Sequence, residues 1–212
     1  MAVTPPIRAV FFDIGNVLLH FDIGAILKEI AAALGRHPLK VAASLLDTKR
    51  ISALERGEID SGELFRIFRE ELGYRGSFAQ FKILWCDHFT LERRTAALLK
   101  KVSRRLPTYL LSNTHALHYD FIKSRYAFIK LVRGAALSHE LGMRKPEARI
   151  FRAALRLAKL RRPEQALFID DLEVNVRGAR AAGLQSLRYR GPEDLERRFR
   201  ELGVLPGGER TV

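Results

Sequence analysis

Short runs of apolar residues recur along the chain, and many of them end at a polar residue or a glycine. The first run, Ala9 to Phe12, is apolar at every position, which is typical of a parallel strand covered by helices on both faces. Asp13 follows it directly, and Gly15 and Asn16 then break the strand. The pattern predicts a central strand with an aspartate at its carboxyl end, the edge where open α/β sheets bind ligands. An aspartate before a Gly-Asn pair can also be a plain turn former.

Between residues 23 and 89 the apolar positions instead recur at the three- and four-residue spacing of amphipathic helices. Asp60, with Glu63 three residues later, predicts a helix start with a capping box. Glycines at positions 35, 57, 73 and 76 separate the helical segments. We therefore expect a helical cap of four or five helices over residues 22–90. Beside the ligand-binding edge of a sheet, such an insertion can act as a lid.

From Leu91 onward, helical and strand patterns alternate. We expect helices over 95–105, 116–126, 146–159, 173–182 and 192–202, and strands over 108–111, 131–137, 166–169 and 185–189. Pro146 suits the first turn of its helix, and the tail from Leu205 is expected to be loose. The alternation predicts an α/β fold, a doubly wound (Rossmann-like) parallel sheet formed by residues 1–21 and 91–205, with a small α-helical cap inserted after the first strand.

The composition is that of an ordinary globular protein, with 212 residues, 47% hydrophobic and 29% charged. The single cysteine, Cys86, excludes a disulfide within the chain and fits a reducing compartment. No apolar run approaches the length of a membrane span, and no apolar core follows a basic N-terminal start. We expect a soluble, unprocessed cytoplasmic protein without a membrane partner, either a monomer or a dimer.

The net charge of +13, from 37 Lys and Arg against 24 Asp and Glu, is the unusual feature. Such an excess attracts anions, whether nucleic acid, acidic lipid headgroups or a small phosphorylated substrate. Most of the basic residues fall at polar positions of predicted helices, and no zinc-ligand pattern, aromatic RNA-binding signature or continuous basic arm accompanies them. We interpret them mainly as solvated helix faces, which makes nucleic acid an unfavoured partner.

Polar residues follow three of the predicted strands, and the carboxyl ends of parallel strands meet at one edge of a sheet. These residues are Asp13, Ser112 with Asn113, and Asp170 with Asp171. Lys145 lies in a loop just before a predicted helix and can reach the same edge. Carboxylates from two strands can hold Mg²⁺, which keeps water and a substrate phosphate as further ligands. The metal and the lysine would neutralise a phosphate, so that an anionic carboxylate can attack it.

Four segments in this order resemble the motifs of the haloacid dehalogenase-like (HAD) hydrolases: FFDIGNVLL, LLSNT, GMRKPEARIF and FIDDLEVNVRGA. The resemblance extends from about Ile7 to Tyr189 and implies that the helical insertion is the family's small C1-type cap. GMRKPEARIF, ERGEID and the DIGNV form of the first motif are most similar to bacterial α-D-glucose-1-phosphate phosphatases. They also resemble the phosphatase half of bifunctional epoxide hydrolases. The resemblance implies a Mg²⁺-dependent phosphomonoesterase for a sugar phosphate such as glucose 1-phosphate.

The resemblance also implies how a phosphate would be handled. Asp13 would be the nucleophile that forms an aspartyl-phosphate, which water then hydrolyses. Ser112, with Asn113 beside it, would bind the phosphoryl oxygens. Lys145 would pair with both the phosphate and Asp13 and keep the nucleophile ionised.

For the metal, the resemblance implies Asp13, Asp171 and the backbone carbonyl of Gly15 as Mg²⁺ ligands. Asp170 would orient water on the metal without coordinating it. The sequence departs from the family pattern at Gly15, where most family phosphatases carry a second acid that protonates the leaving group. General acid–base help is worth about 10² to 10⁴ in rate, so a leaving group that needs little protonation is favoured. The acidic anomeric hydroxyl of a sugar 1-phosphate is one such group.

Several alternatives stay open. His20, His139 or a water on the metal can supply the missing proton, and Arg56, Glu58 and Trp85 of the cap are candidates for reading the substrate. Trp85 can equally be a packing residue. A weakly catalytic protein that binds phospho-ligands or nucleic acid, and a 2-haloacid dehalogenase, are the competing functions. The Asp170-Asp171 pair favours a metal-dependent phosphatase over the dehalogenase.

Overall fold

In the computed structural model, which describes residues 5–207, a sheet of five parallel strands forms the centre of the larger part of the chain. Its strand order is β5 (Ala135–Leu137), β4 (Thr108–Ser112), β1 (Ala9–Phe12), β6 (Ala166–Asp170) and β7 (Gln185–Arg188). β1 pairs with β4 on one side and β6 on the other, and Phe12 lies opposite Leu110 and Ile169. The predicted parallel sheet with the first strand at its centre is confirmed.

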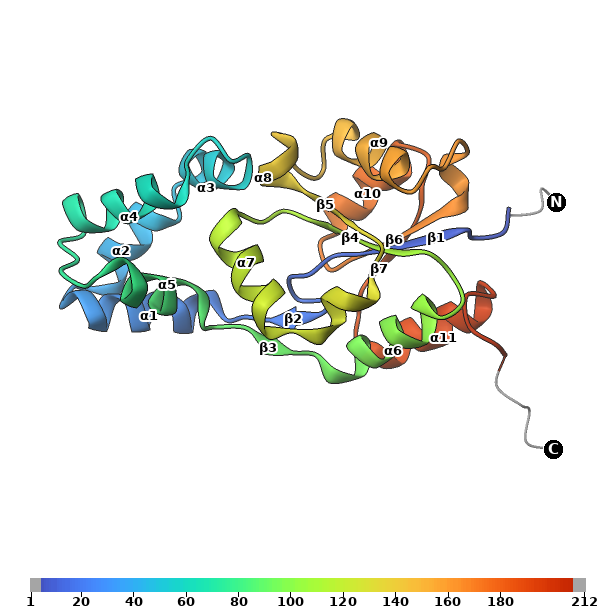
Figure 1. Cartoon of the computed structure of the whole chain (residues 1–212), viewed down its shortest axis with the longest axis horizontal. Coiled ribbons are helices and arrows are strands. Elements are labelled where there is room, and N and C mark those ends of the chain that lie inside the picture. The colour runs from blue at the N-terminus through green and yellow to red at the C-terminus, as the bar shows by residue number, and fades with distance from the viewer. Residues whose placement is uncertain (1–4, 208–212) are drawn as a thin grey trace.

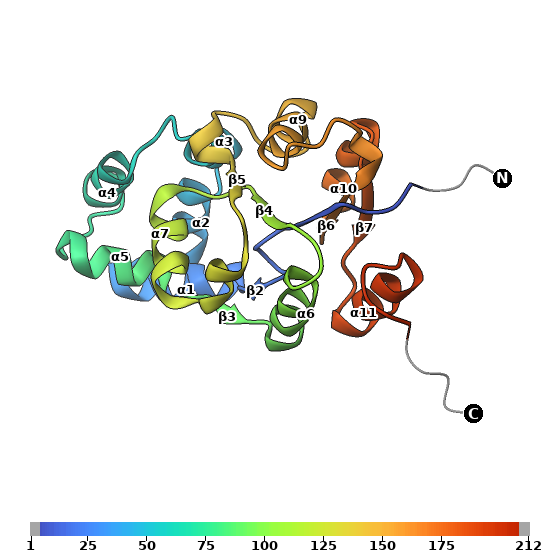
Figure 2. The same ribbon diagram turned by 45° about the vertical axis from the view of Figure 1, so that its right-hand side comes forward.

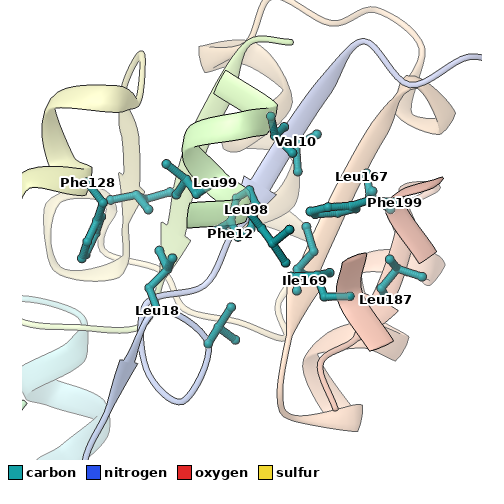
Figure 3. Close-up of a cluster of buried hydrophobic side chains, with 14 of the residues drawn as sticks. Val10, Phe12, Leu18, Leu98, Leu99, Phe128, Leu167, Ile169, Leu187 and Phe199 are labelled. Atoms are coloured by element: carbon teal, nitrogen blue, oxygen red, sulfur yellow. The ribbon is translucent and has the colours of Figure 1, made fainter. Parts of the chain in front are cut away.

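The side chains of β1 alternate between two apolar layers, because successive residues of a strand point to opposite faces. The covering helices are α6 (Arg93–Ser103) and α11 (Pro192–Glu201) on one face, and α9 (Ala148–Leu157) and α10 (Glu173–Ala181) on the other (Figure 1). Phe12 packs with Leu98 and Phe199 on the first face (Figure 3), and Phe11 packs with Phe151 on the second. The sheet is thus doubly wound, which explains why β1 is apolar at every position.

Five helices are inserted after the first strand, as the spacing predicts. They are α1 (Ile23–Leu34), α2 (Pro38–Leu45), α3 (Thr48–Glu55), α4 (Ser61–Glu70) and α5 (Phe78–Cys86). They gather beyond the carboxyl ends of the strands in Figures 1 and 2 and share an apolar cluster around Phe68 and Phe81. A two-stranded antiparallel ribbon of β2 (Leu19–His20) and β3 (Thr90–Leu91), which the sequence did not predict, connects the insertion to the sheet.

The predicted capping box at the start of α4 forms only in part. The Asp60 carboxylate accepts a hydrogen bond from the Glu63 amide at 2.8 Å, but the Glu63 side chain pairs with Arg66 instead of returning to the cap. A complete capping box forms at α5, where Ser77 and Gln80 bond each other's backbone amides. The Glu63 carboxylate is bound to Arg66, so it does not complete the capping box.

The predicted strand over 131–137 begins only at Ala135, because Ala127–Leu131 forms a 3-10 helix, η1. Two short helices were not predicted, α8 (Ser138–Leu141) and the 3-10 helix η2 (Pro163–Gln165). α7 (Ala116–Arg125) lies where the pattern placed it. No helix within residues 5–207 is long and apolar enough to cross a membrane.

Two further expectations were wrong. Pro146 lies before α9 and not in its first turn, because Glu147 has an extended backbone and forms the N-cap. The tail is not loose at Leu205, which is buried and donates its amide hydrogen to the Phe199 carbonyl at 3.1 Å. The last five residues of the predicted tail, 208–212, lie outside the described residues.

Candidate active site

The polar residues that end the strands do meet at one edge of the sheet. β1 and β6 are neighbours, so Asp13 after β1 lies beside Asp170 and Asp171 at the end of β6. Carboxylate oxygens of these three residues lie within 4.8 Å of one another. Ser112, at the end of β4, is close enough to Asp13 that its side chain lowers the pKa of the Asp13 carboxyl. Strand pairing alone therefore assembles four side chains that the sequence keeps far apart.

Lys145 is buried at the centre of this cluster, with 1% of its surface exposed. Its Nζ lies 2.8 Å from Asp13 Oδ1 and 2.6 Å from Asp170 Oδ2. Burial opposes the charge of the ammonium group, but the two carboxylates outweigh it and raise the pKa of Lys145. The lysine is therefore a fixed cation, bound to Asp13 as expected and also to Asp170, which was not predicted.

The Asp13 carboxyl is also buried, and burial raises its pKa to about 7. Lys145 opposes this rise, whereas the neighbouring charge of Asp170 adds to it. Oδ1 of Asp13 also accepts a hydrogen bond from the Ile14 amide at 2.8 Å, which fixes the carboxylate plane. Positive charge near Asp13 would favour its ionised, nucleophilic form.

Asp170 and Asp171 have different surroundings despite being adjacent. Both oxygens of Asp170 are occupied: they accept hydrogen bonds from the Leu172 amide at 2.9 Å, the Asn175 amide group at 3.0 Å and Lys145 at 2.6 Å. Asp171 is only partly buried, and burial raises its pKa while the Asn16 side chain opposes the rise. This difference supports Asp171 as the metal ligand and Asp170 as the residue that positions Lys145.

The donor set fits a hard divalent cation. Three carboxyl groups face one ammonium group at the cluster, and oxygen ligands are those that Mg²⁺ prefers. The backbone carbonyl of Gly15, two residues after Asp13, is the further ligand expected from the sequence. Asp13, Asp171 and this carbonyl would hold the ion.

The side chain of Asn113 acts as a clamp on the Lys145 loop. Its Oδ1 accepts a hydrogen bond from the Lys145 amide at 2.8 Å, and its Nδ2 donates to the Lys145 carbonyl at 3.0 Å. Both ends of the amide are thus used to hold the lysine in place. The Asn113 side chain, which was expected to contact phosphate, is therefore occupied by the Lys145 backbone.

A cavity of about 250 Å³ lies between the inserted helices and this edge of the sheet. On the sheet side it is lined by Ile14, Gly15, Ser112 and Asn113, so it opens directly onto the strand ends. Trp85 lines the opposite side and donates its Nε1 hydrogen to His115 Nε2 at 3.0 Å. Of the three cap residues proposed to read the substrate, Trp85 is therefore at the cavity.

Arg56 and Glu58 are placed elsewhere, because neither is among the described residues that line this cavity. Arg56 forms an ion pair with Glu147 of the sheet domain, and Glu58 is exposed. Glu55, which the sequence analysis did not single out, faces the cavity instead and lies 2.7 Å from Arg144. Adjacent residues of a helix point about 100° apart, so the orientation of α3 decided which of them faces inward.

The histidines proposed from the sequence also lie away from the cavity, and other histidines line it. His20 pairs with Glu92 at 3.0 Å, and His139 bonds the Thr114 carbonyl at 3.2 Å. Neither is among the residues that line the cavity, whereas His88, His115 and His118 are. Sequence reasoning also missed Asn175, although it lies within the fourth motif, five residues after the aspartate that it bonds. Glu55 begins the ERGEID segment of the resemblance, whereas no pattern in the sequence pointed to His115.

Gly15, the position of the missing acid, is covered by an aromatic ring. A Cβ atom built on Gly15 would lie 3.1 Å from Cε1 of Phe21. A side chain at position 15 would therefore need Phe21 to move. The departure from the family pattern thus consists of an absent acid together with an apolar ring near its place.

This fold and this edge of strand ends define a hydrolase of the haloacid dehalogenase type. A family model described as haloacid dehalogenase-like hydrolase matches residues 7–183, so the chain belongs to this family. Among solved structures, HAD family enzyme BT-2542 from Bacteroides thetaiotaomicron is similar, with 26% identity and a TM-score of 0.82 over 92% of this chain and 100% of that one. A complex of the same wild-type enzyme, with a TM-score of 0.79, contains magnesium and inorganic phosphate.

Two more distant similarities add less. The 2-haloacid dehalogenase of Pseudomonas syringae shares 21% identity over 86% of each chain, with a TM-score of 0.61, which shows the common fold alone. The drimenol cyclase drtB of Aspergillus calidoustus is 22% identical over 94% of this chain. The chain spans only 37% of the length of that relative, so the match concerns one part of a larger protein.

Proposed function

We propose that this chain is a Mg²⁺-dependent phosphomonoesterase that uses Asp13 as its nucleophile. The observation that carries the proposal is the buried Asp13–Lys145 pair beside two further carboxylates at the sheet edge. A related enzyme with both magnesium and phosphate bound supports it. Residues 22–90 would form a C1-type cap domain on a core of residues 1–21 and 91–205.

In this mechanism the Asp13 carboxylate attacks phosphorus, and the bond from phosphorus to the ester oxygen breaks. The product is an aspartyl-phosphate, which water then hydrolyses to release phosphate and restore Asp13. Ser112 and Lys145 contact the phosphoryl oxygens and offset their negative charge. When bound, Mg²⁺ supplies further positive charge that allows two anions to approach. Asn113 and Asp170 hold Lys145 at the distance this requires.

The substrate is a small phosphorylated metabolite. A sugar phosphate such as glucose 1-phosphate is the candidate from the sequence, supported by the absence of an acid at Gly15, because the anomeric hydroxyl leaves with little protonation. A 2-haloacid dehalogenase would use the same aspartate to attack carbon. The buried Lys145–Asp170 contact and the exposed edge of Asp171 favour phosphate and a metal over that alternative.

The test is phosphate release from phosphorylated sugars, nucleotides and short acids, with Mg²⁺ and with EDTA, alongside halide release from 2-haloacids. Asp13→Asn is compared with Asp120→Asn, a matched change at an exposed aspartate of α7. We expect release that needs Mg²⁺, disappears in Asp13→Asn and is unchanged in Asp120→Asn.

Halide release that persists in EDTA would contradict the phosphatase function and favour a dehalogenase. No release above the Asp13→Asn background from any compound would refute both enzymatic functions. Retention of nucleic acid or phospho-ligands that falls steeply with salt would then favour the binding function that the charge of +13 leaves open.

A further inference from the structure

The wall of the cavity that faces the nucleophile loop is apolar. The inserted helices contribute Ile26, Leu27, Leu45 and Leu54, and Ile14 of the nucleophile loop itself is also apolar. Transfer of a hydroxyl group from water to such a wall is unfavourable unless the group finds a hydrogen-bond partner. The hydroxyls of a sugar would meet few partners here, whereas an apolar group would release water from both surfaces.

Part of the wall is aromatic. Phe21 and Phe89 lie edge to face at 6.0 Å between ring centres, and Phe89 meets His118 edge to face at 5.0 Å. Trp85 stacks on His118 at 5.7 Å. All four side chains line the cavity. Such edges and faces suit a further aromatic ring, because aromatic pairs prefer edge-to-face or offset contacts.

The titratable groups of the wall do not offer a free charge. Glu55 is paired with Arg144 at 2.7 Å. Burial lowers the pKa of His118 to about 4 and that of His115 well below its usual range, so both rings are neutral at pH 7. His88 bonds the Leu84 carbonyl and lies 3.5 Å from Glu29. The cavity therefore suits an uncharged group attached to the single phosphate at Asp13.

The ring of Phe21 near Gly15 sets a second, independent requirement. No carboxylic acid stands at position 15 to protonate the departing oxygen, and a Cβ atom there would lie in tight contact with Phe21, 3.1 Å from its Cε1. An oxygen that departs readily as an anion avoids the need for that acid. A phenolic hydroxyl has a pKa of about 10, as in tyrosine, far below that of water at about 15.7.

From these observations we infer that the substrate is a phosphate monoester of an apolar, aromatic alcohol of the phenol class, whose ring occupies this cavity. The inference rests on the proposed phosphatase function and replaces the sugar by an aryl group. A cavity of about 250 Å³ lies at the small end of ligand pockets, which measure roughly 300–1,000 Å³, and so suits a single substituted ring.

The chemical step is balanced without another reactant. An Asp13 oxygen forms a bond to phosphorus while the bond from phosphorus to the aryl oxygen breaks, and the electron pair leaves on the phenolate. The phenolate takes its proton from water. A second water hydrolyses the aspartyl-phosphate, which yields inorganic phosphate and the Asp13 carboxylate.

Four esters separate the two requirements: phenyl phosphate, cyclohexyl phosphate, glucose 6-phosphate and glucose 1-phosphate, each with Mg²⁺. Phenyl and cyclohexyl phosphate have similar size and apolarity but differ in leaving-group acidity, so kcat should favour phenyl by about 10²-fold or more. Cyclohexyl and glucose 6-phosphate both release ordinary alcohols, so kcat/KM should favour cyclohexyl roughly tenfold through apolar contact. Glucose 1-phosphate should fall below phenyl phosphate in kcat/KM.

A pair of leucines provides the matched variants. Leu46, the C-cap residue that follows α2, lines the cavity, whereas Leu39 within α2 is 73% exposed and is not among the lining residues. Leu46→Asn should raise KM for phenyl phosphate severalfold and leave KM for glucose 6-phosphate unchanged. Leu39→Asn should change neither.

A binding measurement that needs no turnover completes the test. Phenylphosphonate should bind the Mg²⁺-loaded protein roughly tenfold or more tightly than methylphosphonate in calorimetry, and Leu46→Asn should narrow the difference. Equal binding of the two phosphonates, or a higher kcat/KM for glucose 1-phosphate than for phenyl phosphate, would overturn the aryl substrate while leaving the phosphatase intact. Absence of phosphate release from all esters would refute the phosphatase itself, and the phosphonate comparison would still decide whether the cavity prefers a ring.

Discussion

The strand ends and the wall of the cavity are built in opposite ways, although they face the same space. At the strand ends the buried charged side chains have several partners: Lys145 contacts two carboxylates, and Asp170 accepts bonds from Leu172, Asn175 and the lysine. The cavity wall consists mainly of side chains from separate helices in apolar contact. Directional bonds tolerate few replacements, whereas apolar contact depends on shape and area. We propose that the first region sets the reaction and that the second selects the substrate.

The inserted helices and the part of the chain that carries the sheet are joined by both apolar contacts and ion pairs. The cluster around Phe68 and Phe81 includes Leu117 of α7, so the inserted helices share buried surface with the sheet domain. Ion pairs from α3 to the sheet domain, Arg56 with Glu147 and Glu55 with Arg144, add charge contacts at the same boundary. Changes at this boundary should therefore alter substrate access more than the chemical step.

Lys145→Met should have the largest effect. It leaves two buried carboxylates without their cation, which typically costs about 3–5 kcal/mol in the free energy of unfolding. Urea unfolding at pH 7.5 would measure this, with the exposed Lys40→Met as control. We also expect kcat to fall by at least about 10³-fold, since charge compensation at the phosphate is lost. If Lys145→Met changed only KM, the proposal that the strand ends carry out the chemical step would be wrong.

His118→Gln tests whether the cavity wall is held neutral. The pKa of His118 is about 4 in the folded chain and near 6.5 when unfolded, so only the unfolded chain takes up this proton between those values. The stabilisation that comes from keeping His118 neutral is complete above pH 6.5. As the pH falls toward 4, the free energy of unfolding decreases by about 3 kcal/mol on this account. Glutamine can still donate to the Trp85 carbonyl.

Urea unfolding of both proteins at pH 7.5 and 4.5 measures the difference. The wild type should lose more stability between the two pH values than His118→Gln. Equal losses would show that His118 is protonated in the folded chain and that the wall carries charge.

Asn175→Ala should have an intermediate effect at the strand ends. The Asn175 side chain donates to both oxygens of buried Asp170. Its loss leaves those oxygens short of a donor, which lowers the free energy of unfolding by about 1–3 kcal/mol. Because Asp170 holds Lys145, kcat should fall while KM stays within about twofold. Asn16 neighbours the metal site and Gln80 belongs to the capping box of α5, so the exposed Lys49→Ala in α3 serves as the control. A fall in stability with an unchanged kcat would separate Asp170 from catalysis.

Arg56→Ala should have the smallest effect on stability. Its ion pair with Glu147 is partly exposed, and such pairs contribute about 0–1 kcal/mol. Since it joins α3 to the sheet domain, we expect KM to change severalfold with kcat nearly constant. Arg66→Ala, which breaks ion pairs only within α4, should leave both constants unchanged. A large fall in kcat for Arg56→Ala would mean that the boundary contributes to the chemical step.

The sequence by itself determined the sheet and the residues at its edge. The strand Ala9–Phe12 is apolar on both faces, so it is buried only if helices cover both faces of the sheet. This places Asp13 at the end of a central strand. Alternation of helices and strands then brings Ser112 and Asp170 to the same edge, because parallel strands align their carboxyl ends. These conclusions needed only local pattern and topology.

Only the tertiary structure decided how those residues are held and what faces them. The clamp of Asn113 on the Lys145 loop and the ring of Phe21 near Gly15 join segments through contacts that no spacing encodes. Glu55 lines the cavity and the next residue, Arg56, does not, because of the rotation of one short helix. Side-chain direction on a packed helix depends on the angle at which it meets its neighbours, and that angle is a property of the whole core.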